Sequence, residues 1–421
     1  GQPSEPRENG RRYTDAILFH NNVQVQTYGY CTDVYFDAAI DFIDGALSSK
    51  KPFFAYIPTN TPHGPYHDVP EALYRKYKSK DLNPILLGNE NDADTVARVF
   101  AMVENVDQNV GKLLGHLDRR RIAENTIVIF MVDNGPNTQR YVVNSRGKKN
   151  EVHDGGIRSP FFVRWPSEIE PGTRNDRIAA HIDVMPTLLE AAGANLPEDH
   201  PFDGRSILPL LKGKRVDWPN RSFVLQIHRG NEPIPLHHIA VREQRWKLVH
   251  PTGFRHDKMP ENVPLELYDM EVDPGETHNL SEQRPEVARR LKQTYDTWFA
   301  DVSNTRTNNY DPPRIVLGTK FETSTTLSTQ DRRETEDGGE WLLEFRNGKS
   351  YDIEFLWKEP VASAQLELQI GSIRERLSVP KNSDTAFLKS ISIPDGELAL
   401  SANVVKGGRD ATPYHIILHQ L

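Results

Sequence analysis

The clearest pattern along the chain is a helical stripe between Asp94 and Leu117, where apolar residues recur at alternating steps of three and four. The stripe consists of Val96, Val99, Val103, Val106, Val110, Leu113 and Leu117. This spacing predicts a long helix with one face in a core. Shorter patterns of the same kind predict helices over Tyr30–Leu47, Val184–Ala192 and Pro285–Phe299.

Short runs of apolar, β-branched and aromatic residues follow two of these helices. Phe53–Ile57 comes after the helix over Tyr30–Leu47, and Thr126–Val132 comes after the helix over Asp94–Leu117. Neither run contains Pro or Gly, so both suit central strands covered on two faces. Phe161–Trp165 is a further candidate strand. A helix followed by a strand, twice over, predicts an α/β fold with a mostly parallel sheet flanked by helices.

The pattern changes after residue 212. Short strand patterns cover residues 222–227, 239–242, 246–249 and 265–268 ahead of the last predicted helix. Residues 213–302 are therefore predicted to form a smaller antiparallel α+β subdomain. Residues 303–313 are rich in Asn, Thr and Pro, a composition that predicts a linker.

Residues 314–421 show only strand and turn patterns, which predict a C-terminal all-β domain. Asn347-Gly348 lies between two strand-like runs and predicts a two-residue hairpin turn, and Gly371-Ser372 separates two further runs. A β-sandwich-like appendage fits these patterns best. A glycan-binding role and a packing role both remain open for it.

Composition and charge narrow the classes of function. The chain has 421 residues, of which 37% are hydrophobic and 26% are charged, and its formal net charge is -8. This charge gives no electrostatic case for binding nucleic acid, so an anionic ligand must be met by a local basic pocket. No segment has the unbroken apolar length of a membrane span. The single cysteine, Cys31, excludes a disulfide within the chain and is predicted to be a small buried thiol.

Candidate metal ligands stand directly after the strand Thr126–Val132. Asp133 and Asn134 lie at its carboxyl end, and this is the edge at which open α/β sheets bind ligands. Carboxylate and amide oxygens are the ligands that Ca²⁺ and Mg²⁺ prefer. The alternative is a tight turn without metal, because Asp-Gly and Asn-Gly sequences favour turns.

Basic residues and a glycine pair follow within the same stretch. Arg146-Gly147-Lys148-Lys149 precedes Asp154-Gly155-Gly156-Ile157-Arg158-Ser159-Pro160. Cations beside a hard-metal site make a pocket for an oxyanion. From Asp133 to Pro160 the chain resembles the sulfatase family of the alkaline-phosphatase superfamily, the formylglycine-dependent, arylsulfatase-like enzymes. Members have an Asp-Asn metal pair, then a Lys, then an acidic residue with Gly-Gly-x-Arg-x-Pro.

His63 is the second candidate for chemistry. It lies in Pro62-His63-Gly64-Pro65, just past the strand Phe53–Ile57, on a stiff loop that points to the same sheet edge as Asp133. An imidazole there can hydrogen-bond a sulfate oxygen or donate a proton to a leaving alcohol. The loop resembles the Pro-His-x-Pro loop of the same family, and a solvated surface histidine is the alternative.

The resemblance covers roughly Tyr13 to Val302 and implies an enzyme that hydrolyses sulfate esters. Asp133 and Asn134 would bind a divalent metal, which is Ca²⁺ or alternatively Mg²⁺. Lys149, five residues before Asp154 as in the family, would bind the sulfate, with Lys148 as the second choice. His63 would bind sulfate or protonate the leaving oxygen.

The family's nucleophile is a formylglycine made from a Cys/Ser-x-Pro-x-Arg motif. The chain carries no such motif, and Ser4-Glu5-Pro6-Arg7 has its Arg one residue early. We therefore expect residues 1–212 to be the C-terminal part of the catalytic domain, with the motif and a further Asp pair on a missing N-terminal segment of that domain.

The resemblance also implies a sulfated small molecule or glycan as substrate, and a periplasmic or extracellular place. Two alternatives remain open. The first is a phosphodiesterase or phosphonate hydrolase of the same superfamily, and the second is a non-catalytic product if the protein begins at Gly1.

Overall fold

The computed structural model describes residues 12–21, 23–87, 92–195, 201–228, 232–254, 259–305, 310–329, 331–335, 339–406 and 413–421. These residues divide into two units, and the second runs from Tyr310 to Leu421. The border between the units falls within the stretch 303–313, whose composition is that of a linker.

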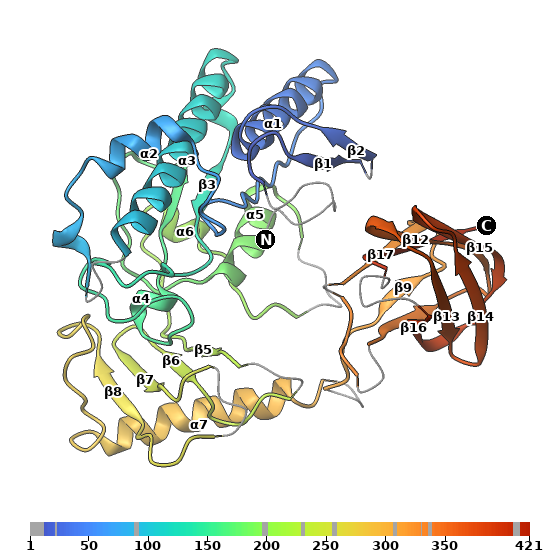
Figure 1. The fold of residues 1–421 in the computed structure, drawn as a ribbon. Coiled ribbons are helices and arrows are strands. Elements are labelled where there is room, and N and C mark those ends of the chain that lie inside the picture. Colours follow the sequence, from blue (N-terminus) through green and yellow to red (C-terminus); the bar gives the residue numbers. More distant parts are fainter. Residues whose placement is uncertain are drawn as a thin grey trace. The chain divides into compact units, whose positions relative to one another are not determined.

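The first unit contains helices along its whole length (Figure 1). They are α1 (Cys31–Ser48), α2 (Glu71–Lys78), α3 (Ala93–Arg119), α4 (Asp154–Ile157), α5 (Val184–Ala191), α6 (Leu208–Leu211) and α7 (Pro285–Val302). The four longest predicted helices are confirmed as α1, α3, α5 and α7. On α3, Val96, Val99, Val106 and Leu117 are buried as the stripe predicts, whereas Val103 is exposed.

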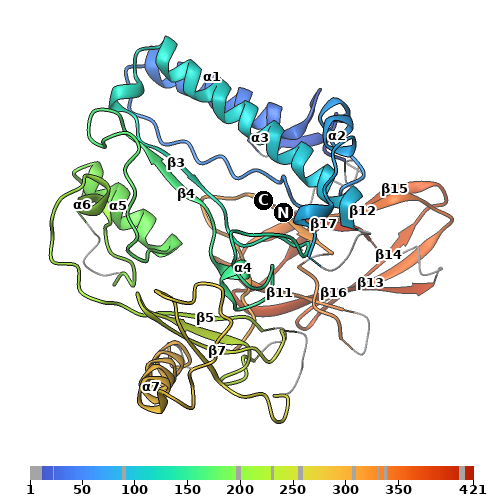
Figure 2. The same cartoon turned by 90° about the vertical axis from the view of Figure 1, so that its left-hand side faces the viewer.

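α1 and α3 lie side by side (Figure 2), and Ile43 packs with Leu117 in one hydrophobic cluster. Cys31 opens α1 as a buried free thiol, and burial raises its pKa to about 12. The thiol is therefore protonated and unreactive near neutral pH. Within the described ranges, no helix combines the length and the apolar character needed to cross a membrane.

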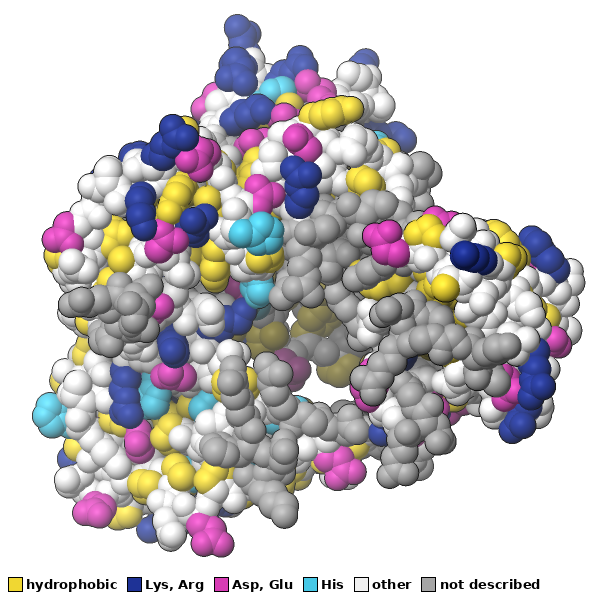
Figure 3. All heavy atoms as spheres, viewed as in Figure 1, with side chains coloured by type: hydrophobic (Ala, Val, Ile, Leu, Met, Phe, Trp, Pro, Cys, Tyr) yellow, Lys and Arg dark blue, Asp and Glu magenta, His cyan; other side chains and the backbone are white. Residues whose placement is uncertain are grey.

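Charged side chains of both signs are interspersed over α2 and α3 (Figure 3). Lys76 on α2 pairs with Glu104 on α3 at 2.7 Å, and Arg98 pairs with Asp94 at 2.8 Å along α3 itself. Such surface pairs neutralise one another locally and stabilise little. This face of the unit thus presents mixed charge.

Strands of the first half of this unit come in two antiparallel pairs. β1 (Ile17–His20) pairs with β2 (Val23–Gln26), and β3 (Val128–Met131) pairs with β4 (Phe161–Arg164). β3 and β4 confirm the strands predicted around Val128 and Phe161. No parallel pair occurs among the described strands of this unit, so the mostly parallel sheet stays a prediction.

The segment Phe53–Ile57, predicted as a central strand, forms no strand among the described residues. Its side chains alternate between exposed and half-buried positions, as in a strand, and Phe54 and Tyr56 are 73% and 78% exposed. The sequence has the composition of a buried strand, but a strand also needs a neighbour that satisfies its backbone groups.

A second sheet follows, with the strand order β5 (Phe223–Gln226), β6 (Ile239–Arg242), β7 (Trp246–His250) and β8 (Glu266–Asp269), all antiparallel. One face, which includes Ile239 and Leu248, packs on Leu291 and Tyr295 of α7. The other face, with Ala240, Val249 and Tyr268, packs on Val152. The small sheet is therefore covered by α7 on one side and by the segment before α4 on the other.

The second unit is built from two β-sheets. The first has the order β10 (Ser324–Ser328), β17 (His415–Gln420), β12 (Ser350–Val361), β15 (Ser383–Ser392), and the second has the order β14 (Ile373–Val379), β13 (Ala364–Ile370), β16 (Gly396–Lys406), β11 (Trp341–Phe345), β9 (Ile315–Leu317). Residues of both sheets share one core, in which Trp341 and Trp357 are each 1% exposed. These two tryptophans thus stabilise the sandwich and offer no platform for a sugar ring.

The hairpin predicted at Asn347-Gly348 is wrong. β11 pairs with β16 and β9, whereas β12 pairs with β15 and β17, so the turn joins strands of different sheets. Asn347 and Gly348 do have the positive φ angles that their sequence favours, 67° and 41°. Both flanking strands bury alternate residues in the shared core, and this burial requires them to face each other across it. At Gly371-Ser372 the prediction is confirmed, because β13 and β14 pair there as neighbours.

Candidate functional site

The two candidate metal ligands stand where β3 ends. The Asp133 carboxylate is exposed, and its Oδ1 accepts a hydrogen bond of 2.9 Å from the backbone N–H of Asn134. The side-chain nitrogen of Asn134 donates to the carbonyl of Gly135 at 2.9 Å. That bond uses the amide nitrogen and not the amide oxygen. A carboxylate and an amide oxygen are therefore presented together at the end of the strand.

Backbone hydrogen bonds join this turn to the basic segment. The N–H of Gly135 donates to the carbonyl of Gly156 at 2.9 Å, and the N–H of Lys149 donates to the carbonyl of Pro136 at 2.8 Å. Both contacts are between main-chain atoms, so they fix where the chain runs whatever the side chains do. The structure thus brings Asp133 and Asn134 together with the segment that carries Lys148 and Lys149.

Glycine is required for this approach. A Cβ atom on Gly135 would lie 1.8 Å from the carbonyl oxygen of Gly155, and one on Gly155 would lie 2.3 Å from the carbonyl oxygen of Gly147. The colliding atoms are backbone atoms that cannot rotate away. The glycines of the motif therefore serve to let the turn after β3 and the segment before α4 lie in direct contact.

The end of the basic segment, at His153 and Asp154, is buried against the small sheet. His153 is 4% exposed, and its Nε2 lies 3.4 Å from Oε2 of Glu266 on β8. Tyr268 also donates to this carboxylate, at 2.5 Å. The contact with His153 lowers the pKa of Glu266, so its carboxylate stays charged beside the imidazole.

Three site-supporting residues were missed by sequence reasoning: Lys247, Glu266 and Glu276. Lys247 and Glu276 are buried next to Asp154. The Nζ atom of Lys247 lies 2.7 Å from Oδ1 of Asp154, and Oε2 of Glu276 lies 2.7 Å from the backbone nitrogen of Asp154. The signal available for Lys247 was its place in the apolar run Trp246-Lys247-Leu248-Val249, since a lysine on a buried strand needs a partner. No comparable signal marks Glu276, which lies in a polar turn.

The sequence-predicted His63 lies on an exposed loop that is braced from behind. Its Nδ1 is 2.8 Å from the carbonyl of Gly64, and its own carbonyl accepts a hydrogen bond of 2.9 Å from the Tyr13 hydroxyl. Within the described parts of the chain, no hydrogen bond or ion pair joins His63 to Asp133, Asn134, Lys148 or Lys149. Its role at the site stays a prediction.

His181 is a histidine that does contact the end of β3. It is exposed, and its Nε2 donates to the carbonyl of Val132 at 3.0 Å, one residue before Asp133. This bond holds the strand end from the side of α5. His181 therefore supports the backbone that precedes the candidate metal ligands Asp133 and Asn134.

The donor set at Asp133 and Asn134 fits two ligands of a hard divalent cation. Both offer oxygen, and the Asp133 carboxylate faces solvent. In the described ranges no group of three or more His, Cys, Asp or Glu side chains gathers as a metal site. Ca²⁺ takes six to eight oxygen ligands, so further ligands must come from elsewhere.

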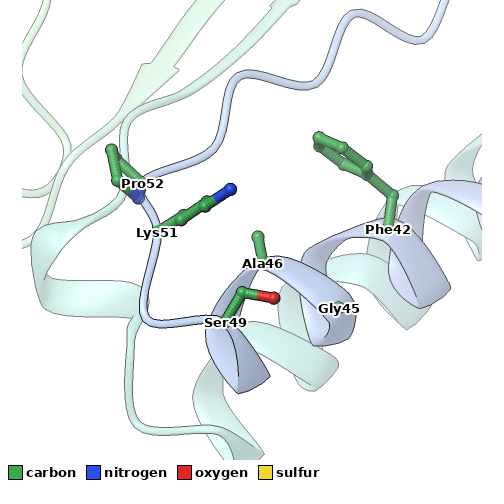
Figure 4. Close-up of a pocket in the computed structure, with 6 residues that line it drawn as sticks. All are labelled: Phe42, Gly45, Ala46, Ser49, Lys51 and Pro52. Atoms are coloured by element: carbon green, nitrogen blue, oxygen red, sulfur yellow. The ribbon is translucent and has the colours of Figure 1, made fainter.

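Two apolar hollows lie along α1, and neither is lined by a candidate residue. The first is lined by Phe42, Gly45, Ala46, Ser49, Lys51 and Pro52, and in Figure 4 the side chains of Phe42 and Lys51 border the same space. The second continues from Tyr35 and Phe42 to Phe54 and Tyr56. The second hollow thus lies against the segment Phe53–Ile57, which was predicted as a central strand.

Gly135→Ala is predicted to disrupt the site without unfolding the small sheet. The new methyl group must displace Gly155, so the contact between the turn and the Lys149 segment opens. We expect faster amide exchange over residues 133–158 and unchanged exchange over β6 and β7, measured by hydrogen–deuterium exchange. Gly111→Ala, at an exposed position of α3 where a Cβ meets no atom within 4 Å, is the control. Equal exchange in both variants would contradict the role given to Gly135.

Comparisons with known proteins identify related sequences over the first unit. Residues 7–194 match the family described as Sulfatase, and residues 148–299 match the family described as N-sulphoglucosamine sulphohydrolase, C-terminal. The ulvan-active sulfatase of Formosa agariphila is 30% identical over 257 residues, which are 56% of this chain and 49% of that protein. The N-acetylgalactosamine-6-O-sulfatase of Bacteroides thetaiotaomicron is 27% identical over 290 residues, 63% of this chain and 50% of that protein.

The chain spans about half the length of these curated relatives. Among solved structures, Ps i-CgsB in complex with k-i-k-neocarrahexaose aligns with a TM-score of 0.55 at 24% identity, covering 67% of this chain and 58% of that one. This likeness shows a shared α/β fold. The two family matches together run from residue 7 to residue 299, and this part of the chain therefore carries a sulfatase-family domain.

Proposed function

We propose that the protein hydrolyses sulfate esters of carbohydrates. The observation that carries this proposal is the backbone contact that fixes the Asp133-Asn134 turn beside the Lys148-Lys149 segment. It sets two oxygen ligands for a metal next to cations that can bind an oxyanion. The two relatives, an ulvan-active sulfatase and an N-acetylgalactosamine-6-O-sulfatase, support a glycan substrate.

In this proposal Asp133 and Asn134 hold a divalent cation, Ca²⁺ or alternatively Mg²⁺. The cation, when bound, supplies positive charge at the sulfate oxygens. Lys149 binds a non-bridging oxygen and stabilises the charge that develops there, and Lys148 is the second candidate for this task. His63 orients the sulfate or donates the proton that the leaving alcohol requires.

The nucleophile comes, in this proposal, from a segment with the Cys/Ser-x-Pro-x-Arg motif whose first residue becomes formylglycine. The segment Phe53–Ile57 supports such a partner. Its backbone makes no hydrogen bond to another backbone group among the described residues, and its aromatic side chains are exposed beside the apolar hollows of α1. A strand of the N-terminal segment would pair here and complete a mostly parallel sheet. We place the enzyme in the periplasm or outside the cell.

Lys149→Ala in the full-length enzyme should lower kcat/KM for a sulfated glycan by about 10²–10³-fold, because one charge-stabilising donor is lost. Lys148→Ala should have the smaller effect. Lys76→Ala, which removes a surface ion pair on α2, is the matched control and should change little. Near-full activity of the Lys149 variant would remove Lys149 from the mechanism. Faster turnover of phosphate diesters than of sulfate esters would favour a phosphodiesterase instead.

Asp133→Ala should abolish stoichiometric metal in the purified full-length protein, since it removes the carboxylate ligand. The measurement is elemental analysis after dialysis, with Asp118→Ala as the control on an exposed aspartate that pairs with Arg164. A variant that keeps one tightly bound cation per chain would show that Asp133 is not a metal ligand.

Phe54→Ser should destabilise the full-length protein by about 3 kcal/mol, because the side chain is buried once a strand pairs with this segment. Phe387→Ser, on an exposed position of β15, should change the free energy of unfolding by less than about 0.5 kcal/mol. Chemical denaturation measures both. Equal, small effects would argue that no strand docks on Phe53–Ile57.

A further inference from the structure

Three buried charged residues lie where the Lys149 segment meets the small sheet. Lys247 on β7 is 0% exposed, Glu276 is 1% exposed, and Asp154 is 5% exposed. The Nζ atom of Lys247 lies 2.7 Å from Oδ1 of Asp154 and 2.7 Å from Oε1 of Glu276. The lysine thus bridges two carboxylates out of contact with water.

Glu276 also binds the backbone of Asp154, the other carboxylate partner of Lys247. Its Oε2 accepts a hydrogen bond of 2.7 Å from the N–H of Asp154, which is the first residue of α4. Its own carbonyl accepts a bond of 3.3 Å from Arg146, at the start of the basic segment. Glu276 therefore contacts both ends of the segment that carries Lys148 and Lys149.

A second set of contacts holds the same two ends. Arg146 donates to the Tyr268 hydroxyl at 2.9 Å and lies 3.4 Å from Glu266. His153, next to Asp154, lies 3.4 Å from the same glutamate. Figure 1 shows α4 beside the β5–β8 sheet, in agreement with these contacts. Both ends of residues 146–154 are fixed by groups on one small sheet.

The energetics explain why Lys247 matters most in this arrangement. Burying a charge without a partner is costly, whereas a buried pair with good geometry keeps most of its attraction. Lys247 is the shared partner of two carboxylates, so its loss would leave both of them buried without that partner. The segment could regain water for Asp154 only by moving away from the sheet.

We propose that Lys247 is a positioning residue that, through Asp154 and Glu276, fixes the 146–154 segment so that Lys149 meets the sulfate. This inference rests on the proposed function for its last step only. Lys247 is buried away from solvent, and the small sheet thereby sets the geometry of the segment that lies beside the turn after β3.

The test uses the full-length protein with Lys247→Met, which keeps length and removes charge. Asp154→Asn is the second variant, because it weakens the ion pair but keeps the backbone bond to Glu276. Both should raise amide exchange over residues 146–158 by about tenfold or more, an opening confined to one segment. Both should also weaken the binding of inorganic sulfate, measured by titration calorimetry, by a similar factor.

Arg290→Gln is the matched control. Arg290 on α7 makes an ion pair with Glu243, next to β6, at 2.6 Å and 2.8 Å, and none of its contacts reaches the 146–154 segment. This variant should lower stability while exchange over residues 146–158 and sulfate binding stay as in the wild type. If its loss of stability alone speeds exchange in the segment, the special role of Lys247 is overturned.

The outcomes separate this inference from the proposed function. Unchanged exchange over residues 146–158 in both Lys247→Met and Asp154→Asn overturns the positioning role. Faster exchange with unchanged sulfate binding also overturns it, because the segment would then be held without consequence for the anion. Failure of the wild type to bind sulfate or cleave sulfate esters contradicts the proposed function, while the exchange data still report whether Lys247 holds the segment.

Discussion

The contact between Gly135 and the Gly155-Gly156 pair is the constraint on which the site depends. A hydrogen bond of 2.9 Å joins Gly135 to Gly156, and a side chain at Gly135 would meet the Gly155 carbonyl at 1.8 Å. Main chain can approach main chain this closely only where no Cβ intervenes. Because of this approach, the candidate metal ligands Asp133 and Asn134 and the segment that carries Lys149 lie next to each other. The chemistry of the site is thus set by backbone geometry before any ligand arrives.

That contact is in turn held from the far side by the small sheet. Ala240, Val249 and Tyr268 pack on Val152, and beside this apolar contact Lys247 bridges Asp154 and Glu276. The apolar part supplies non-directional attraction, whereas the buried ions fix one arrangement, since any other would leave a charge unpaired. Residues 146–156 are therefore held by the turn after β3 on one side and by the small sheet on the other. The β5–β8 sheet carries no candidate catalytic residue, yet its contacts determine where the segment with the candidate Lys149 lies.

Sequence patterns predicted the parts of this molecule that depend on local periodicity. The stripe on Asp94–Leu117 became α3, and the short strands after residue 212 became β5 to β8. The Asp-Asn pair, Lys149 and the glycines could be placed in one stretch because the whole constellation spans fewer than thirty residues. Lys247 and Glu276 could not be assigned, because their partner Asp154 lies about a hundred residues earlier in the sequence and nothing local indicates the pairing. The Asn347-Gly348 hairpin failed for a related reason, since the turn type is local but the choice of neighbouring strand is not.

The segment Phe53–Ile57 connects the fold with the metal site that we propose at Asp133 and Asn134. Its alternating pattern is that of a strand, yet Phe54 and Tyr56 are exposed and its backbone groups lack a partner strand among the described residues. Asp133 and Asn134, likewise, offer two oxygen ligands where a Ca²⁺ ion takes at least six. Ligands in α/β sheets gather at the carboxyl ends of neighbouring strands. A strand that paired with Phe53–Ile57 would end at the same sheet edge as β3. Residues just beyond its end would then be placed to supply further metal ligands. The proposed N-terminal strand would therefore account both for the exposed aromatic segment and for the ligands that the proposed metal ion still needs.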